Sequence, residues 1–587
     1  MEISRIFDIL EHYLEYYPDQ QSALACKKNG VWKKFSIIEY RELVDILSFG
    51  LFHIGIKSGD KIGLVSKNRP EWNIIDMAIM QSGAISIPIY PTISREDYSY
   101  ILQHSEMKMI FIDNADLLKT LQPVLDKLPK LKFVFLIDPV NGKYESYENL
   151  LEQGRNNPNP ELLTAIKSGI KPEDLATIIY TSGTTGSPKG VMLSHSNIVN
   201  QILNLRETPA KWSKTALSFL PLCHAYERMI VYLYQYLGMS VYYAESIEKI
   251  GENIKEINPS MMTCVPRLLE KIYDKLYAAG HDFEGFKKKL YYWAFDKATK
   301  YQLEGMSLWL KLQLKIADKL IYSKWRKAIG GNFDIVVSGG SAIQSHIASF
   351  FSAIGMPVFE GYGMSEASPV IAVSQRGKNG RKFGTVGLPL PGVEVKLGEM
   401  DEIQCKGHNV MIGYYKEPEL TAKTIDNEGW LHTGDTGKFT SEGQLIITGR
   451  LKSFFKTSYG KYVNPQAIES KFTESPFIEN MIVLGENKQY AASVISPDFE
   501  YLKKWCKIEK IDCSNNISII KEPKVVEVYK NEIEKYNTFF GHSEQIKKWK
   551  LVPDTWTQDG GQLSPTLKIK RNILENQYHE EIKQLFE

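Results

Sequence analysis

A run of glycine and hydroxyl residues follows the apolar segment ATIIY and ends in a lysine. The run is Thr181-Ser182-Gly183-Thr184-Thr185-Gly186-Ser187-Pro188-Lys189-Gly190. Glycines let a backbone turn tightly and direct its N–H groups inward, while the hydroxyls and the lysine add donors for phosphate oxygens. A generic loop of this kind is usually a flexible surface loop, and the spacing is not that of a Walker A loop. The preceding strand, the hydroxyl density and the Pro-Lys-Gly ending nevertheless favour a nucleoside triphosphate site.

A second pair of glycine-rich segments joins an aromatic ring to a carboxylate. The segments are Ser338-Gly339-Gly340-Ser341 and Glu360-Gly361-Tyr362-Gly363-Met364-Ser365-Glu366. A tyrosine between glycines has an open face on which a purine can stack. Ser365 can donate to a phosphate, and Glu366 is a hard oxygen ligand suited to Mg²⁺. The alternative is a structural connection with Tyr362 in the core and Glu366 at a helix N-terminus.

Two further motifs lie towards the C-terminus. The first, Gly429-Trp430-Leu431-His432-Thr433-Gly434-Asp435, ends in an aspartate whose two oxygens can accept from both ribose hydroxyls. Arg450 can donate to the same sugar, and a structural ion pair between Asp435 and Arg450 can coexist with that role. The second motif is the run from Leu563 to Arg571, which contains Lys568. A lone lysine in such a place is ordinarily a solvated charge.

These four motifs, in this order and over nearly the whole chain, resemble those of the adenylate-forming superfamily, in its long-chain fatty acid–CoA ligase branch. The resemblance implies that ATP activates a fatty acid as an acyl-adenylate, which is then transferred to coenzyme A with release of AMP and pyrophosphate. It implies ATP, Mg²⁺ and coenzyme A as ligands. Two alternatives stay open: a ligase that loads a carrier protein, and an acyl- or nucleotide-binding regulator without turnover.

The resemblance also implies roles for individual residues. It places Tyr362 against adenine, Ser365 on the α-phosphate, and Asp435 with Arg450 on the ribose. Thr184 and Glu366 are the implied metal ligands. The full set implied to bind nucleotide or coenzyme A is Thr181, Ser182, Gly183, Thr184, Thr185, Gly186, Lys189, Gly339, Gly340, Ser341, Glu360, Gly361, Tyr362, Gly363, Ser365, Asp435, Arg450 and Lys461.

A catalytic lysine is implied near the C-terminus. Lys568 aligns with the family lysine that neutralises charge while the carboxylate attacks the α-phosphate. The residue before it is Leu567 instead of the usual glycine, so Lys570 is the neighbour to test.

The resemblance also implies a hinge and two domains. Lys452 occupies the pivot position, with Ser453 in place of the common acidic residue, and 457–465 matches the loop that enters the site for the thioester step. The implied division is an ATP- and acyl-binding domain over 1–451 and a mobile lid domain over 452–587.

The acyl end has weaker signals. The segment PLCHAYER, 221–228, resembles the stretch that borders the acyl tunnel of long-chain synthetases. His224 there can position or gate the carboxylate, or it can be a histidine satisfied in the core. The helical insertion 283–330 is also typical of the long-chain branch. Its lysines at 311, 315 and 319 share one helical face. A solvated face is the first interpretation, and peripheral contact with a membrane is the second.

Short apolar runs separated by helical stretches must position these motifs. They are KIGLVS (61–66), AISIPIY (84–90), KMIFID (108–113), KFVFLID (132–138), LATIIYTSG (175–183) and FDIVVSGG (333–340). The pattern predicts parallel strands covered by helices on both faces, with ligands at the C-terminal ends of the strands. With the resemblance, the expected fold is α/β: doubly wound mixed sheets and a β-barrel-like subdomain, followed by a small α+β domain.

The composition excludes several classes of protein. A chain of 587 residues is too long for one core. A net charge of +2 argues against nucleic-acid binding through a general positive field. The six scattered cysteines indicate reduced thiols in a cytoplasmic protein. The N-terminus does not have the pattern of a signal peptide, and the most apolar stretch, 229–244, is too short to span a bilayer. The oligomeric state stays open.

Overall fold

The computed structural model describes residues 3–128, 130–139, 142–181, 187–513, 515–557, 560–563 and 569–587, apart from the side chain of Lys452. The chain divides into two units. Unit 1 comprises 1–396, 404–433 and 439–446, and unit 2 comprises 397–403, 434–438 and 447–587. The predicted division at 451/452 stays a prediction.

Unit 1 contains an eight-stranded sheet whose centre is parallel. The order is β19 (Gly413–Tyr414), β9 (Lys189–Ser194), β8 (Leu175–Thr181), β4 (Ile85–Ile89), β3 (Lys61–Val65), β5 (Met109–Ile112), β6 (Phe133–Leu136) and β7 (Glu145–Ser146). The pairs from β8 to β7 are parallel, whereas β8 with β9 and β9 with β19 are antiparallel. The hairpin of β8 and β9 therefore brings Thr181 opposite Lys189, both from the hydroxyl-rich run 181–190, at the C-terminal end of a buried strand.

A nine-stranded sheet, also in unit 1, carries the second glycine-rich pair. Its order is β16 (Leu388–Pro389), β15 (Val370–Val373), β14 (Val358–Gly363), β13 (Ile335–Ser338), β12 (Met261–Cys264), β10 (Thr215–Ser218), β11 (Ser240–Tyr243), β1 (Leu24–Lys28) and β2 (Val31–Phe35). Strands β12, β13 and β14 are parallel neighbours. Each of the six runs predicted to be strands contains one, and their parallel pairing is confirmed.

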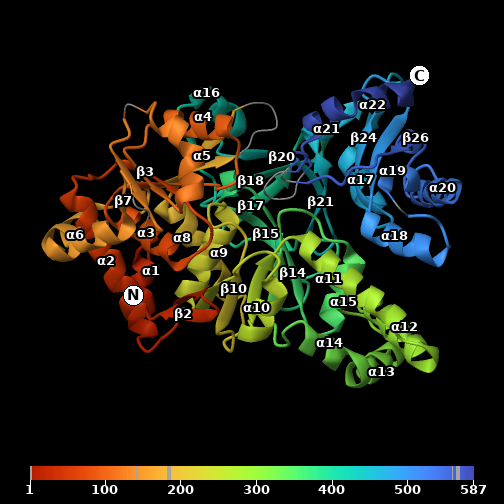
Figure 1. The fold of residues 1–587 in the computed structure, drawn as a ribbon, viewed down its shortest axis with the longest axis horizontal. Coiled ribbons are helices and arrows are strands. Elements are labelled where there is room, and N and C mark those ends of the chain that lie inside the picture. The colour runs from red at the N-terminus through yellow and green to blue at the C-terminus, as the bar shows by residue number, and fades with distance from the viewer. Residues whose placement is uncertain are drawn as a thin grey trace. The chain divides into compact units, whose positions relative to one another are not determined.

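Helices flank these sheets (Figure 1). They are α1 (Asp8–Tyr16), α2 (Ile37–His53), α3 (Pro70–Gln81), α4 (Arg95–Ser105), α5 (Ala115–Leu125), α6 (Tyr147–Asn156), α7 (Pro160–Gly169), α8 (His195–Leu205), α9 (Ala225–Tyr236), α10 (Ile250–Ile257), α11 (Pro266–Ala279), α12 (Gly285–Thr299), α13 (Leu308–Ala317), α14 (Ser323–Ala328), α15 (Ser345–Ala353) and α16 (Pro418–Thr424). A π-helical turn, Asp318–Tyr322, joins α13 to α14. The insertion 283–330 is thus helical, as predicted.

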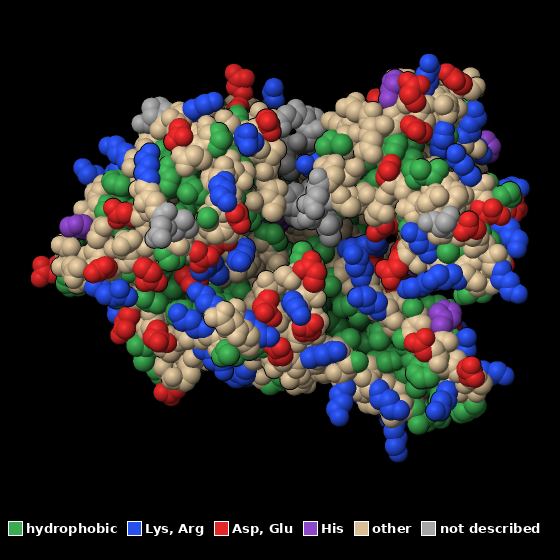
Figure 2. All heavy atoms as spheres, viewed as in Figure 1, with side chains coloured by type: hydrophobic (Ala, Val, Ile, Leu, Met, Phe, Trp, Pro, Cys, Tyr) green, Lys and Arg blue, Asp and Glu red, His purple; other side chains and the backbone are tan. Residues whose placement is uncertain are grey.

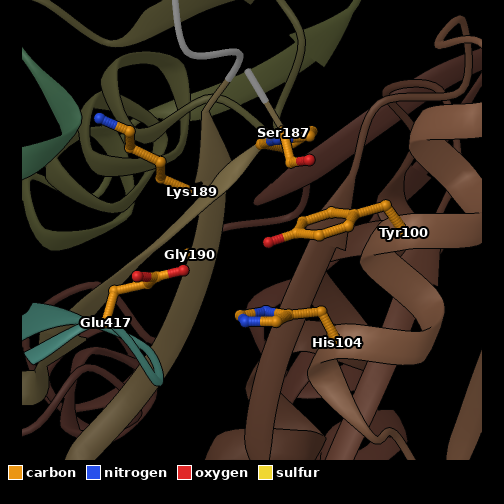
Figure 3. Close-up of a pocket in the computed structure, with 7 residues that line it drawn as sticks. Tyr100, His104, Ser187, Lys189, Gly190 and Glu417 are labelled. Atoms are coloured by element: carbon orange, nitrogen blue, oxygen red, sulfur yellow. The ribbon is translucent and has the colours of Figure 1, made fainter. Parts of the chain in front are cut away.

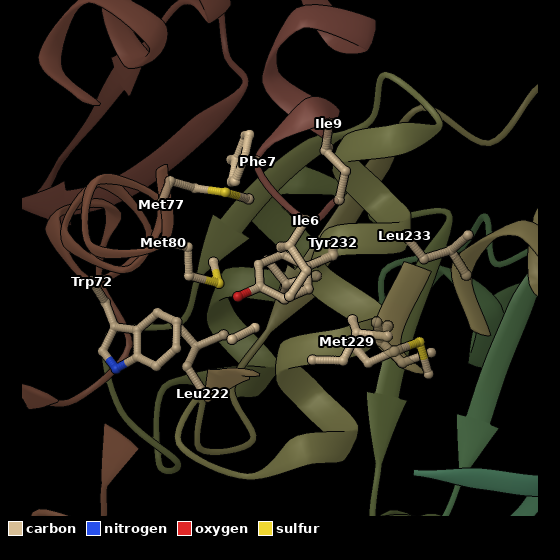
Figure 4. Close-up of a cluster of buried hydrophobic side chains, with 14 of the residues drawn as sticks. Ile6, Phe7, Ile9, Trp72, Met77, Met80, Leu222, Met229, Tyr232 and Leu233 are labelled. Carbon is tan, nitrogen blue, oxygen red and sulfur yellow. The ribbon is translucent and has the colours of Figure 1, made fainter. Parts of the chain in front are cut away.

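The core of unit 1 lies where α3, α9 and the N-terminal segment meet. Apolar side chains from all three pack there (Figure 4), among them Phe7, Trp72, Met80 and Met229. The same interface buries an ion pair, in which Arg228 of α9 contacts Asp76 of α3 at 2.6 Å. Arg228 also donates to the Thr177 hydroxyl of β8 at 2.8 Å. Because a buried charge is tolerated only when paired, these bonds fix α9, and the residues at its N-terminus, against the eight-stranded sheet.

Unit 2 contains a three-stranded sheet of β24 (Ile478–Leu484), β25 (Ala491–Pro497) and β26 (Ile546–Leu551), and a hairpin of β22 (Phe455–Lys456) and β23 (Tyr462–Val463). Its helices are α17 (Pro465–Phe472), α18 (Phe499–Ile508), α19 (Asn516–Ile519), α20 (Pro523–Asn537), α21 (Arg571–Gln577) and α22 (His579–Phe586). The strands of a further four-stranded sheet, β17 (Val393–Leu397), β18 (Glu402–Gly407), β20 (Leu431–Phe439) and β21 (Leu445–Arg450), each have residues in both units. The alternation of helices and strands gives the α+β composition expected for the C-terminal part.

Two expectations from composition can be compared with the structure. All six cysteines are free, and five of them are buried. Within the described ranges, no helix combines the length and the apolar character needed to cross a membrane.

Candidate active site

Lys189 and Glu366 both contact a buried tyrosine, Tyr414. The hydroxyl of Tyr414 donates to a carboxylate oxygen of Glu366 at 2.8 Å. The ammonium group of Lys189 lies 5.4 Å from the centre of the Tyr414 ring, within cation–π range. Burial and the Glu366 charge raise the pKa of Tyr414, so its hydroxyl remains a donor. The tyrosine thus contacts both a carboxylate and a cation, and the cation belongs to the hydroxyl-rich run 181–190.

The backbone explains why these three residues meet. Lys189 opens β9, and Tyr414 in β19 pairs with Val191 of β9. The carbonyl of Glu366, in the short 3₁₀ turn Ser365–Ala367, accepts the N–H of Met411 at 2.9 Å. The segment just before β19 is therefore bonded to the turn that carries Glu366. Tyr414 was missed by sequence reasoning, because nothing in the local pattern of residues 411–415 marks it.

A small pocket lies at Ser187–Gly190, the end of the hydroxyl-rich run 181–190 (Figure 3). Its lining residues are Tyr100, His104, Ser187, Pro188, Lys189, Gly190 and Glu417. Tyr100 and His104 both come from α4, and the Lys189 side chain points away from them. Nδ1 of His104 lies 2.9 Å from the hydroxyl of Tyr180, the residue just before Thr181. Burial, and secondarily Lys416, lowers the pKa of His104. A neutral histidine thus contacts Tyr180 near the C-terminal end of β8, a contact that the sequence does not signal.

The glycines of the segments 338–341 and 360–366 lie at the C-terminal ends of two neighbouring strands of the nine-stranded sheet. Ser338 pairs with Glu360 in adjacent parallel strands, so Gly339 and Gly340 follow β13 where Gly361 and Gly363 end β14. A Cβ on Gly363 would lie 1.8 Å from the carbonyl oxygen of Pro369, which only glycine permits. Tyr362 is half-buried between these glycines, and Ser341 is exposed.

Glu360 is buried in β14, next to these glycines. Burial raises the pKa of its carboxyl to about 8, against the opposing effects of the Gly384 N–H and Arg381. The N–H of Gly384 donates to a Glu360 oxygen at 3.3 Å. Near neutral pH the side chain is therefore largely protonated, and it offers a donor as well as an acceptor.

His224 caps the N-terminus of α9. Its Nδ1 accepts the N–H of Tyr226 at 3.2 Å, and its ring meets that of Tyr90 edge-on at 6.4 Å. The hydroxyl of Tyr226 donates to the carbonyl of Val337 at 3.3 Å, and its ring lies 3.1 Å from the position of a Cβ on Gly339. The cap therefore brings the PLCHAYER segment next to the glycines that follow β13. Because His224 is only half-buried, both of its predicted roles stay open.

A buried carboxyl three residues after His224 makes the stability of the fold depend on pH. Ser218 donates to Glu227 at 2.6 Å, Thr263 also donates to it, and burial raises its pKa from 4.5 to about 7. Since the folded pKa exceeds the unfolded one, this stabilisation is fully present below about pH 4.5 and is lost as the pH rises through about 7. A Glu227→Gln variant does not ionise. The thermal midpoint of the natural protein minus that of the variant should therefore fall between about pH 4 and pH 8.

Differential scanning fluorimetry over that range tests the pH effect. Glu419→Gln, a change at an exposed carboxylate of α16, is the matched control and should show no such trend. Parallel curves for the natural protein and Glu227→Gln would contradict a neutral Glu227.

In unit 2 the structure pairs the two residues assigned to the ribose. Nε of Arg450 donates to Asp435 at 2.6 Å, and the Asp435 side chain is 6% exposed against 42% for Arg450. The structural ion pair considered from the sequence is thus present, and it leaves the guanidinium partly open to solvent. Lys461 is exposed in the turn between β22 and β23, and Lys452 lies in a 3₁₀ turn, Leu451–Ser453.

Several predicted site residues lie outside the described residues. These are Ser182, Gly183, Thr184, Thr185, Gly186 and Lys568, together with the side chain of Lys452. Their roles stay predictions.

Comparisons with known proteins agree with this arrangement. Residues 10–415 match the family described as AMP-binding enzyme, and 453–587 match the AMP-binding enzyme C-terminal domain. The chain is 30% identical to the long-chain-fatty-acid--CoA ligase FadD15 of Mycobacterium tuberculosis, over 95% of this chain and 93% of that protein. It is also 30% identical to the peroxisomal long chain acyl-CoA synthetase 7 of Arabidopsis thaliana, over 100% of this chain and 87% of that protein.

Solved structures show the same fold at lower identity. The adenylation domain of a carboxylate reductase from Mycobacterium chelonae superposes with a TM-score of 0.74 at 19% identity, covering 99% of this chain and 91% of that one. The o-succinylbenzoate coenzyme A synthetase of Bacillus subtilis, in complex with ATP and magnesium, gives 0.68 at 17% identity, covering 97% and 99%. The glycine-rich strand ends and the contacts of Tyr414 with Lys189 and Glu366 agree with these matches. Because the family model covers residues 10–415, the chain belongs to the AMP-binding enzyme family.

Proposed function

We propose that this protein is an ATP-dependent long-chain fatty acid–CoA ligase that acts through an acyl-adenylate and releases AMP and pyrophosphate. The observation that carries the proposal is the contact of Tyr414 with both Lys189 and Glu366. It occurs in a chain that is similar over nearly its full length to long-chain fatty acid ligases. A lysine of the hydroxyl-rich run 181–190 and a carboxylate suited to a metal ion, held by one tyrosine, suit a reaction at a nucleotide phosphate.

In the first step a carboxylate oxygen of the fatty acid attacks the α-phosphorus of ATP. A new phosphorus–oxygen bond forms, the bond to the bridging oxygen of the β-phosphate breaks, and pyrophosphate leaves. Two anions must meet, so the protein has to hold them in line and neutralise charge. One lysine–oxygen pair at about 4 Å contributes roughly 4 kcal/mol before desolvation at an effective dielectric constant near 20. Lys189 and Lys568 supply this charge in our proposal, and no nucleophilic side chain is needed.

Residues of several motifs bind the nucleotide in the proposed reaction. Thr181 to Gly186 surround the phosphates, Tyr362 stacks on adenine beside Gly339, Gly340 and Gly361, and Ser365 donates to the α-phosphate. Asp435 accepts from the ribose hydroxyls, and its bond to Arg450 orients the carboxylate. His224 faces the carboxylate end of the acyl chain.

The residues at Glu366 fit a magnesium ion that arrives with the nucleotide. Glu366 is 9% exposed, and one of its carboxylate oxygens accepts a hydrogen bond from Tyr414. Among the described residues there is no cluster of three or more potential metal ligands. One carboxylate is what Mg²⁺ commonly takes from a protein when phosphates and water complete its shell, and Thr184 is a second proposed ligand. When bound, the ion would offset phosphate charge.

In the second step the thiol of coenzyme A attacks the acyl carbonyl, loses its proton to solvent, and AMP leaves. We propose that the 452–587 domain turns about Lys452 between the two steps, so that Lys568 withdraws and the 457–465 loop with Lys461 enters. The proposed cellular location is the cytoplasm, which the six free cysteines support.

A panel of acids from acetate to long chains tests this function. Purified protein with ATP, Mg²⁺ and coenzyme A should release AMP fastest with long-chain acids. Parallel reactions with an acyl carrier protein as acceptor test the second candidate, a carrier-loading ligase. Acyl transfer to the carrier but not to free coenzyme A would overturn the proposal in favour of that candidate, and no acid-dependent AMP release would favour a regulator without turnover.

A further inference from the structure

The helical insertion 283–330 concentrates positive charge. It contains eleven basic residues and four acidic ones, a net +7, whereas the whole chain has a net charge of only +2. Two of the four acidic residues are already paired inside the insertion, Asp296 with Lys297 and Lys300, and Asp318 with Arg326. The insertion therefore has an excess of cations that its own carboxylates do not balance.

The same insertion exposes large apolar side chains in a stripe. Along α13 and the following turn, residues at four-residue spacing are solvent-exposed: Leu308 by 84%, Leu312 by 48%, Ile316 by 44% and Leu320 by 42%. Trp309, beside Leu308, is 67% exposed. The opposite side of α13 packs on the protein through Leu314 and Ala317. The helix is thus apolar on two sides, and only one of them meets the rest of the protein.

Lysines border the exposed stripe. Lys311, Lys315 and Lys319 each precede a stripe residue by one position, so they lie about 100° around the helix from it. All three are exposed, and none of them forms a salt bridge within the described part of the chain. On the neighbouring α12, Phe286 is 78% exposed and is followed directly by Lys287. Figure 2 shows blue and green side chains interspersed over α12 to α14 at its lower right. A face that is only solvated would explain the lysines but not the row of exposed leucine and isoleucine side chains.

We propose that α13, with its π-helical turn and the start of α12, lies flat on an anionic lipid bilayer. The apolar stripe would enter the acyl–headgroup boundary, with Trp309 at the interface that tryptophan prefers. The lysine stems can extend along the apolar surface and place their charges among lipid phosphates. A second copy of the chain is a poorer occupant, because two insertions of +7 would repel each other. The surface deepens the proposed function, since long-chain fatty acids partition into bilayers, but docking requires no catalysis.

Vesicle flotation with the full chain tests the surface. The natural protein should float with phosphatidylcholine vesicles that contain phosphatidylglycerol, float far less with pure phosphatidylcholine, and lose binding in high salt, which screens exposed charges. Lys311→Gln/Lys315→Gln/Lys319→Gln should weaken partitioning at least about tenfold, given the contribution of each lysine near an anionic surface. The matched control, Lys507→Gln/Lys521→Gln/Lys524→Gln, removes three exposed lysines of unit 2 and should float like the natural protein.

A second variant tests the apolar stripe separately. Leu308→Ser/Trp309→Ser/Leu312→Ser keeps every charge and should also lose at least about tenfold of its partitioning, because burying apolar side chains drives insertion. Trp212→Ser, at an indole that is 50% exposed elsewhere, is its control. Equal thermal midpoints and equal AMP release with a water-soluble acid show that the variants fold.

The proposal is overturned by equal flotation of both triple variants and the natural protein, by equal binding to neutral and anionic vesicles, or by self-association in sedimentation without lipid binding. Flotation is independent of turnover, so a protein that floats as expected but releases no AMP would count against the ligase function alone.

Discussion

Replacing Lys568 with alanine should slow adenylation by about 10²–10³-fold, the usual scale for the loss of one donor to a transition state. In the proposed first step this lysine neutralises charge as the carboxylate meets the α-phosphate. In the second step it has withdrawn, so thioester formation from pre-made acyl-adenylate should be largely spared. Measuring both half-reactions, by acid-dependent pyrophosphate exchange and by acyl-CoA formation from acyl-adenylate, separates the two effects.

Lys570→Ala is the matched control, because Leu567 departs from the usual glycine and leaves two lysines close together. It should exchange pyrophosphate nearly as fast as the natural protein. If the two variants exchanged roles, Lys570 would be the catalytic lysine, and a Lys568→Ala protein with unchanged exchange would remove Lys568 from the mechanism.

The second large effect is expected at Glu366. Glu366→Gln keeps the shape and an acceptor for Tyr414, but it removes the negative charge that attracts Mg²⁺. We expect kcat/KM for ATP to fall by about 10²–10³-fold, as for a lost transition-state contact, together with a higher Mg²⁺ requirement in the exchange assay. Tyr414→Phe should be affected less, by about tenfold, because it loses one hydrogen bond to a charged group.

The exposed carboxylate Glu419 of α16 supplies the control for charge alone, and Glu419→Gln should behave as the natural protein. An unchanged Mg²⁺ dependence in Glu366→Gln would exclude Glu366 as a metal ligand. A defect in Tyr414→Phe as large as that in Glu366→Gln would instead make the tyrosine a direct ligand of the nucleotide.

The sequence predicted the strands well because each is a short apolar run that ends in polar or glycine residues, as β3 and β13 illustrate. It also predicted the places where chemistry should lie, since parallel strands bring their C-terminal ends to one edge. The sequence also predicted a possible contact of Arg450 with Asp435, because each residue belongs to a motif that is visible locally.

The residues that hold the site in place were not predictable in this way. Tyr414 meets Glu366 and His104 meets Tyr180 only through long-range pairing, and neither belongs to a distinctive motif. The pKa values of Glu227 and Glu360 are set by burial, which depends on the packing of many elements. The apolar repeat of α13 shows the same limit, because periodicity marks an apolar side of a helix but does not reveal whether the fold covers it.

In the proposed reaction, a fatty carboxylate cleaves ATP at its α-phosphate. Incubation of the purified protein with ATP labelled at the α-phosphate, a long-chain fatty acid, Mg²⁺ and coenzyme A, followed by separation of the nucleotides, tests it most directly. Labelled AMP should form in amounts equal to the acyl-CoA, with none when the acid is omitted. Labelled ADP as the product would contradict it.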